Sequence, residues 1–188
     1  MTYPEVKRAE LNEQHLVAFH GFSCGPEGWA QDLSAFLHEN ALPEAEDGLN
    51  KTFVFYSTGR EPVAFATLSA SMVERKNLLS FPPFANPDYP AIPALLLGRF
   101  GVDQRFQGQG YGTVIMRWIK EAARTAPFGC RFVALHVENE NAKAISFYQR
   151  EGFLMTPVKI GRKKYKSLML YDLVASGREE RSEEESPR

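Results

Sequence analysis

The residues with the clearest chemical potential lie between Arg105 and Gly112, where the chain reads Arg-Phe-Gln-Gly-Gln-Gly-Tyr-Gly. Three glycines in five residues leave consecutive backbone N–H groups uncovered by side chains, and an amphipathic helix is predicted to follow at once. The first N–H groups of a helix and the positive end of its dipole attract anions. The spacing therefore predicts a phosphate site, and a plain glycine turn without a ligand is the simpler alternative.

Two familiar phosphate loops do not fit this stretch. A P-loop has Lys followed by Ser or Thr after its last glycine, whereas Tyr111, Gly112 and Thr113 stand here. A dinucleotide loop has the spacing Gly-x-Gly-x-x-Gly early in a repeated βαβ unit, with an acidic residue about 20 positions later. The spacing here is Gly-x-Gly-x-Gly, late in the chain. Magnesium nucleotide chemistry and dinucleotide binding are therefore disfavoured.

Hydrophobic periodicity places the loop between a buried strand over 94–102 and a helix over 110–125, which a strand over 131–138 follows. A further helix is predicted over 141–151, with Asn141 as its N-cap and Gly152 just beyond its end. The remaining elements are expected as a strand over 13–20, a helix over 27–40, a loop over 43–48, strands over 52–57 and 63–73, a proline-rich loop over 80–93, and strands over 153–158 and 167–174.

Composition limits the class of protein. The 188 residues predict one domain over 1–175, followed by an acidic tail over 176–188 that we expect to be disordered. No apolar run is long enough for a membrane helix, and the start lacks a signal core, so we expect a cytoplasmic protein. Cys24 and Cys130 are the two cysteines, which excludes a disulfide framework, and the scattered histidines suggest no metal site.

Two stretches together carry a family resemblance. The first is Arg105-x-x-Gly108-x-Gly110, and the second is Asn141-x-x-Ala144-x-x-Phe147-Tyr148-x-x-x-Gly152-Phe153. In this order they resemble the acetyl-CoA diphosphate loop and the cofactor-proximal helix of the GNAT N-acetyltransferase superfamily. The resemblance implies an α/β fold with a mixed, mostly antiparallel sheet of six to seven strands, splayed at the fourth and fifth strands and flanked by about four helices.

The same resemblance implies roles for individual residues. The backbone of Phe100, Gly101 and Val102 is expected to hold the pantetheine arm, and the N–H of Val102 or its neighbour to stabilise an oxyanion. The diphosphate is expected to bind the loop residues Gln107, Gly108, Gln109, Gly110, Tyr111 and Gly112. Arg105 either adds charge to that site or forms a surface ion pair.

Tyr148 is the expected general acid, because a phenol with a pKa of about 10 can protonate a leaving thiolate; packing on the core is its alternative role. Asn141 is expected to contact the cofactor, and the alternative is a plain N-cap.

No general base is evident: Glu138 is a candidate, whereas His136 reads as a histidine satisfied within the sheet. A basic stretch from Lys159 to Lys166 is either a solvated hairpin or a surface for the CoA 3′-phosphate or an RNA backbone.

A narrower resemblance runs through 22–25, 33–37, 52–54, 66–69 and 89–103, which look like the acetyltransferase toxins of bacterial toxin–antitoxin pairs. Gly101 stands where alanine is common in those toxins. Three functions stay open: an acetyl-CoA-dependent N-acetyltransferase acting on a small-molecule or protein amine, a toxin acetylating the α-amine of aminoacyl-tRNA with an antitoxin partner, or a catalytically silent CoA-binding module. Each is compatible with a homodimer.

Overall fold

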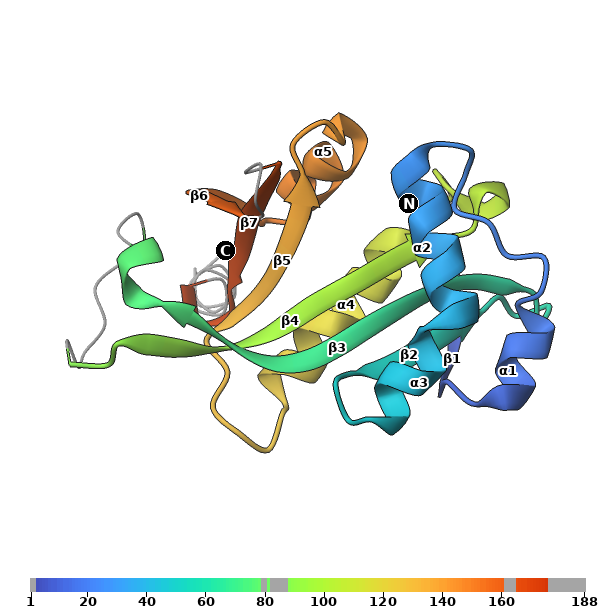
Figure 1. The fold of residues 1–188 in the computed structure, drawn as a ribbon, viewed down its shortest axis with the longest axis horizontal. Helices are drawn as coiled ribbons and strands as arrows, with labels where there is room; N and C mark the ends of the chain where they lie inside the picture. The colour runs from blue at the N-terminus through green and yellow to red at the C-terminus, as the bar shows by residue number, and fades with distance from the viewer. Residues whose placement is uncertain (1–2, 79–80, 82–87, 161–164, 176–188) are drawn as a thin grey trace, which may run out of the picture. The chain divides into compact units, whose positions relative to one another are not determined.

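The computed structural model describes residues 3–78, 81, 88–160 and 165–175, and Figure 1 labels its elements. The strands are β1 (Lys7–Glu10), β2 (Lys51–Tyr56), β3 (Pro62–Glu74), β4 (Ala91–Val102), β5 (Phe132–Glu138), β6 (Leu154–Ile160) and β7 (Lys166–Asp172). The α-helices are α1 (Glu13–Ala18), α2 (Gly28–Glu39), α3 (Ala41–Glu46), α4 (Tyr111–Arg124) and α5 (Ala142–Arg150). Short 3₁₀ turns occupy Arg75–Asn77 and Gln104–Phe106.

The seven strands form one mixed sheet in the order β1-β2-β3-β4-β5-β7-β6. β1 with β2, β2 with β3, β5 with β7 and β6 with β7 pair antiparallel. β4 and β5 are parallel, and α4 separates them in sequence, because parallel neighbours need a long crossover. The predicted mixed, mostly antiparallel sheet is confirmed; about four helices were predicted, and α1–α5 are seen in the part of the chain that the structure describes.

The chain divides into two compact units, residues 1–69 with 97–119 and residues 70–96 with 120–188. β3, β4 and α4 each supply residues to both units. β1 and β2 lie wholly in the first unit, and β5, β6 and β7 lie wholly in the second.

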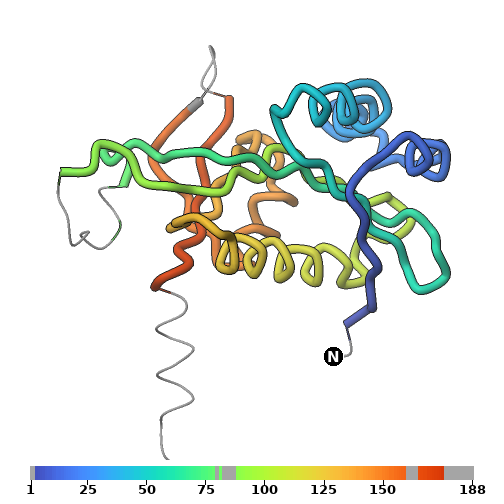
Figure 2. Tube along the Cα trace, turned by 90° about the horizontal axis from the view of Figure 1, so that it is seen from below, coloured from blue at the N-terminus to red at the C-terminus, as the bar shows by residue number. Residues whose placement is uncertain are grey.

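In the first unit, successive residues of β2 point to opposite faces of the sheet. Val54 packs into a core with Phe65 and with residues of α1 and α2. Phe53 and Phe55 instead lie edge-on to Trp118 of α4, with ring centroids 4.9 and 5.3 Å apart from that of Trp118. Figure 2 shows α2 and the first half of α4 on opposite sides of these strands. The loop that precedes α4 is therefore anchored on a helix whose apolar stripe is buried.

The second unit has its own core and a buried link between helices. Its core is formed by Val73, Leu78, Ile92, Ala94, Phe132, Ala134, Leu168 and Leu170. Lys120, from the last part of α4, donates to the Glu151 carbonyl at 2.6 Å and pairs with the Glu151 carboxylate at 3.5 Å. Its ammonium also lies 4.3 Å from the centroid of the Tyr171 ring. These contacts fix the end of α5.

The strand predicted over 13–20 is wrong, because this stretch forms α1. Asn12 starts the helix with a capping box: its side chain accepts from the His15 N–H at 3.1 Å, and its own N–H donates to His15 Nδ1 at 3.2 Å. The first strand is instead β1, at Lys7–Glu10. The reciprocal hydrogen bonds of the capping box at Asn12 outweigh the weak alternation of apolar and polar residues that suggested a strand.

The loop predicted over 43–48 is also wrong in part. α3 spans Ala41–Glu46 and contains Pro43, which lies in the first turn, where a missing N–H costs nothing. β4 begins at Ala91, three residues before the predicted strand. Half of the proline-rich loop and the whole acidic tail lie outside the described residues.

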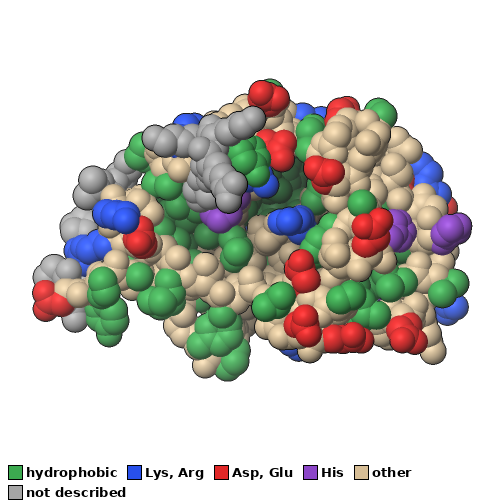
Figure 3. All heavy atoms as spheres, viewed as in Figure 1, with side chains coloured by type: hydrophobic (Ala, Val, Ile, Leu, Met, Phe, Trp, Pro, Cys, Tyr) green, Lys and Arg blue, Asp and Glu red, His purple; other side chains and the backbone are tan. Residues whose placement is uncertain are grey.

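Exposed acidic side chains gather over α2 and α3, on the side of the first unit that Figure 3 displays. They include Asp32, Glu39, Glu46 and Asp47. Within the part of the chain that the structure describes, no helix is long and apolar enough to cross a membrane.

Candidate functional site

The loop between β4 and α4 presents backbone N–H groups. Gly108 and Gly110 adopt positive φ angles of 76° and 87°, a region that side-chain-bearing residues rarely enter. Among the described residues, no acceptor is found for the N–H groups of Gly108, Gln109 or Gly110. α4 begins at Tyr111, so the first N–H groups of the helix join this concave run. The geometry fits a diphosphate.

The guanidinium of Arg105 is held by a buried carboxylate. Its Nε donates to Asp103 Oδ1 at 2.9 Å and a terminal N–H donates to Oδ2 at 3.1 Å. Asp103 is 1% exposed and also accepts from the backbone N–H groups of Arg105 and Ser23. Burial alone would raise the pKa of the Asp103 carboxyl, but these donors and the Arg105 charge outweigh burial and hold the pKa below its ordinary value. Of the two roles considered for Arg105, the structure shows the ion pair.

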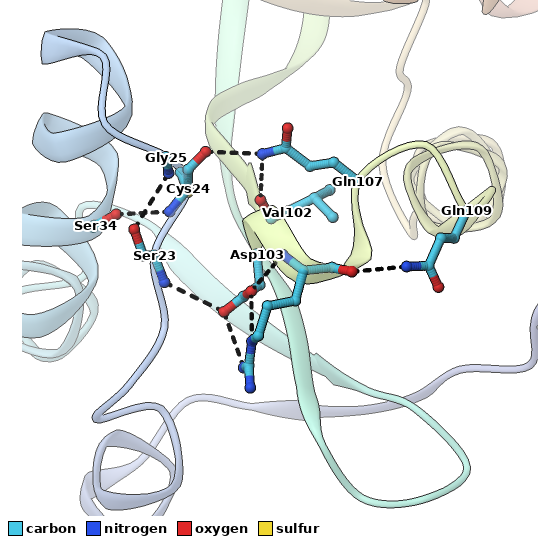
Figure 4. Close-up of polar contacts among 9 residues, drawn as sticks. Ser23, Cys24, Gly25, Ser34, Val102, Asp103, Gln107 and Gln109 are labelled. Carbon is cyan, nitrogen blue, oxygen red and sulfur yellow. Dashed lines mark hydrogen bonds and ion pairs between the residues drawn. The ribbon is translucent and has the colours of Figure 1, made fainter.

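The side chain of Gln107 turns away from the loop's open N–H groups. Its Nε2 donates to the carbonyl of Cys24 at 2.8 Å and to that of Val102 at 3.0 Å (Figure 4). Gln109 lies on the other side of the loop and donates to the Arg105 carbonyl at 2.7 Å. The two glutamines therefore brace the loop through their side chains.

The end of β4 presents alternate backbone groups to opposite edges. The N–H of Asp103 donates to the Val63 carbonyl of β3 at 2.9 Å. Because successive N–H groups point to opposite edges of a strand, those of Phe100 and Val102 point away from β3. This is the orientation required to hold an extended arm of a ligand along β4.

Gly101 is packed too closely to carry a side chain. A Cβ there would lie 2.6 Å from Cys24 Sγ and 2.8 Å from a Phe65 ring carbon. Cys24 is buried, and burial, reinforced by the Asp103 charge, raises the pKa of its thiol to about 12 against a weaker opposing bond from Ser34. The thiol is therefore neutral and inert near pH 7.

The second unit holds Asn141 and Tyr148, at the start and near the end of α5. The Asn141 side chain accepts from the Ala144 N–H at 3.0 Å, so it is an N-cap. The half-buried Tyr148 ring lies between those of Phe147 and Phe153, at centroid distances of 5.3 and 5.7 Å. No described residue hydrogen-bonds its hydroxyl, and burial raises the pKa of the phenol above its ordinary value.

The candidate bases lie on β5. Glu138 is half-buried, and its carboxylate is 3.9 Å from the Lys166 ammonium. His136 is an exposed residue of β5. Partial burial of its imidazole, and then the charge of Lys166, lower the pKa of His136. Within the described ranges, no group of three His, Cys, Asp or Glu side chains could hold a metal ion.

The basic stretch is described only at its two ends. Lys159 donates to the buried hydroxyl of Ser167 at 2.7 Å, and that hydroxyl donates to Asn139 Oδ1 at 2.6 Å. Lys166 faces Glu138 across the strand pair. The residues between, 161–164, lie outside the described part of the chain.

The structure thus brings Phe100–Val102 and Arg105–Gly112 together in the first unit, and Asn141 and Tyr148 together on α5 of the second. Sequence reasoning assigned no role to Asp103 or to the Ser23–Gly25 segment. A signal existed for Asp103, because an aspartate directly after a buried strand and two residues before Arg105 can pair locally. No sequence signal pointed to Ser23, which is 80 residues from its partner.

The family model "Acetyltransferase (GNAT) family" matches residues 21–153. The chain therefore belongs to the GNAT acetyltransferase family, is an N-acetyltransferase, and has the GNAT fold. Among curated proteins, it is 25% identical to the uncharacterized N-acetyltransferase YdgE of Bacillus subtilis, over 80% of this chain and 93% of YdgE. It is 28% identical to a tRNA-acetylating toxin of Mycobacterium tuberculosis, over 66% of this chain and 74% of the toxin.

Solved structures of similar fold include a tyrosine-to-phenylalanine variant of KacT, 25% identical with a TM-score of 0.69, covering 93% of this chain and 98% of KacT. AtaT complexed with acetyl-methionyl-tRNAfMet is 22% identical with a TM-score of 0.66, covering 92% and 98% of the two chains. A tyrosine-to-phenylalanine variant of AtaT, bound to acetyl-CoA and the C-terminus of the antitoxin AtaR, is 22% identical with a TM-score of 0.60, covering 91% and 95%.

Proposed function

We propose that this protein transfers the acetyl group of acetyl-CoA to the α-amine of aminoacyl-tRNA. The observation that carries the cofactor assignment is the run of backbone N–H groups from Gly108 into the first turn of α4. The acceptor assignment is supported by the 28% identity to a tRNA-acetylating toxin. We prefer it to a small-molecule or protein amine because the name of that relative states tRNA as its target.

The cofactor is proposed to bind mainly through the backbone. The N–H groups of Gly108, Gln109, Gly110, Tyr111 and Gly112 would hold the diphosphate, aided by the dipole of α4. The edge of β4 at 100–102 would hold the pantetheine arm by strand-like hydrogen bonds. Arg105 contributes by fixing the loop through Asp103, and its exposed guanidinium adds positive charge nearby.

Acetyl transfer needs a donor for the oxyanion and a proton for the sulfur. We assign the first role to the Val102 N–H and the second to the Tyr148 hydroxyl. The amine nitrogen bonds to the acetyl carbon as the carbon–sulfur bond breaks. Tyr148 gives its proton to the leaving thiolate and regains one from solvent, which also receives the proton lost by the amine.

The acceptor amine needs no strong base. An aminoacyl α-amine has a pKa of about 8 or below, so a useful fraction is neutral near pH 7. This agrees with the pairing of Glu138 with Lys166, which leaves no obvious strong base on β5. An antitoxin partner is part of the same proposal, since AtaT has been solved with the C-terminus of AtaR.

The proposal predicts acetylation of charged tRNA in preference to uncharged tRNA and to a panel of small amines, measured by mass spectrometry of the released aminoacyl group. Tyr148→Phe should lower kcat by about 10²–10⁴-fold and leave the affinity for acetyl-CoA unchanged, because it removes the proton donor alone. Both proteins should show heat on titration with CoA.

Each negative result would contradict a different part of the proposal. Turnover of small amines with charged tRNA untouched would overturn the acceptor assignment. Absence of CoA binding by well-folded protein would overturn the loop assignment. CoA binding without turnover on any amine would leave a silent CoA-binding module.

A further inference from the structure

We infer that Gln107 is a positioning residue for acetyl transfer, and that it acts by fixing the carbonyl of Val102. The inference rests on the proposed function and concerns a side chain rather than the loop's N–H groups. The Gln107 carboxamide bridges two carbonyl oxygens, those of Cys24 and Val102, at 2.8 and 3.0 Å (Figure 4). These two acceptors are remote in sequence, and this side chain joins them.

The bridge fixes the orientation of the carboxamide. An NH₂ group carries two hydrogens, and each finds one carbonyl acceptor here. Turning the group over would place Oε1 against two carbonyl oxygens, where every contact is repulsive. Gln107 is half-buried, and Cys24 is buried, so water competes weakly for these bonds.

The same side chain helps to hold a segment far away in the chain. The Gln104 N–H donates to the Ser23 carbonyl at 2.8 Å, and the Ser23 N–H donates to Asp103 at 3.3 Å. With the Gln107 bond to Cys24, three ties join 102–107 to Ser23–Gly25, the segment that leads into α2. Because Ser34 of α2 accepts from the Cys24 N–H at 3.0 Å, the ties extend to that helix.

The bridge also places the peptide group that the chemistry needs. The peptide joining Val102 to Asp103 is held at both ends: its N–H donates to Val63, and its carbonyl accepts from Gln107. The neighbouring peptide carries the Val102 N–H that we assign to the oxyanion. Gly108 and Gly110 add freedom directly after Gln107, so this bridge is where the flexible loop joins the rigid strand.

The test compares variants that keep or remove the two donated hydrogens. Gln107→Glu is nearly isosteric but faces both carbonyls with oxygen, whereas Gln107→Arg keeps N–H donors. Steady-state kcat and KM are measured with acetyl-CoA and with acetyl-pantetheine, a thioester that lacks the diphosphate. Gln107→Glu should lower kcat by about 10- to 100-fold with both thioesters, because displacement of a reacting group by about 1 Å costs that much. Gln107→Arg should recover most of the loss.

Gln104→Glu is the matched control, since it adds the same negative charge close to the same loop through an exposed side chain. We expect it to raise KM for acetyl-CoA and to leave acetyl-pantetheine unaffected, as charge repulsion of a diphosphate requires. Should Gln107→Glu behave in the same way, Gln107 would be a diphosphate contact and the inference would be overturned. A kcat within twofold of wild type with both thioesters would overturn it as well.

A readout independent of turnover separates this inference from the proposed function. Hydrogen exchange at Cys24 and Gly25 should quicken in folded Gln107→Glu and stay as in wild type in Gln104→Glu, whatever the acceptor. Unchanged hydrogen exchange at Cys24 and Gly25 would show that the Gln107 bridge does not hold this segment in place, and would overturn the inference. If wild type fails to acetylate charged tRNA, the acceptor assignment falls, and the kinetic comparison proceeds with the best amine of the panel.

Discussion

Gly101 lies where β4 passes two buried side chains, and it shows how one residue adapts to its neighbours. Alanine is common at this position in the toxins that the chain resembles, whereas Cys24 and Phe65 occupy the space here. Gly101→Ala should therefore destabilise the protein by about 1–3 kcal/mol through overpacking, as measured by chemical denaturation. Gly129→Ala, where a Cβ meets nothing within 4 Å, is the control and should stay within about 0.5 kcal/mol.

A double mutant identifies the cause of that loss. Cys24→Ala removes the sulfur that the new methyl group would meet at 2.6 Å. Gly101→Ala should cost less in the Cys24→Ala background than in wild type, because part of the clash is gone. Equal costs in both backgrounds would show that the sulfur is not the obstacle.

Tyr148 predicts the shape of a pH profile. Burial raises the pKa of its phenol above the ordinary value of 10.0. A donor with a raised pKa stays protonated at every pH below that value. Loss of the Tyr148 proton should therefore cause no fall in kcat below about pH 10, and the Tyr148→Phe profile should have the same shape in that range. A fall in kcat near pH 8 or 9 that this substitution removes would contradict the assigned state.

At the scale of elements, the junction of β4 with the loop depends on the ionised Asp103. The folded pKa of this carboxyl lies below its ordinary value of 3.8, so its contribution to stability is present above that value and is lost as the pH falls through the folded pKa. Asp103→Asn should be less stable than wild type at pH 7, and the difference should shrink near pH 3. Urea denaturation at the two pH values measures it, with exposed Asp32→Asn as the control.

The elements that the sequence predicted well are the long periodic ones. α4 and α5 agree with their predicted helices within a few residues, and β5 and β7 agree similarly with their strands. A strand was wrongly predicted over 13–20 because the helix there has only six residues. So short a helix shows too little helical periodicity of apolar residues to outweigh an alternation of apolar and polar residues. The capping pair of Asn12 and His15 decides the structure there, and His15 is an unusual partner for a capping box.

The residues of the candidate site also differ in how well the sequence predicts their structure. Glycines at 108 and 110 predicted a turn, and in the structure both adopt positive φ angles. The partners of Asp103 and Gln107 could not be predicted, because the Ser23 and Cys24 backbone groups lie 80 and 83 residues away in sequence. Backbone donors and acceptors are present at every residue whatever its type, so only the fold reveals which of them pair with Asp103 and Gln107.

At the scale of the whole molecule, charge is unevenly distributed along the chain. Three arginines and five glutamates give residues 176–188 a net charge of −2, which leaves +1 for residues 1–175. Exposed carboxylates also gather over α2 and α3 (Figure 3). A phosphate backbone should therefore avoid α2 and α3, and acidic residues at the C-terminus should weaken its long-range attraction.

Removing residues 176–188 should raise kcat/KM for charged tRNA at low salt, because two net negative charges are lost. The gain should shrink above about 0.15 M salt, where the Debye length falls to about 8 Å. Turnover of a small neutral amine with acetyl-CoA, measured in parallel, should change little. A gain that persists at high salt would point to a cause other than electrostatics.

The aromatic contacts of Trp118 give the protein an internal optical reporter. Phe53, Phe55 and the Arg8 guanidinium surround this indole on the same helix that begins at the glycine loop. Trp29 is the other tryptophan, so Trp29→Phe leaves Trp118 as the sole source of indole emission. A ligand that settles on the first turn of α4 should alter that emission, which would allow coenzyme titrations in unlabelled protein.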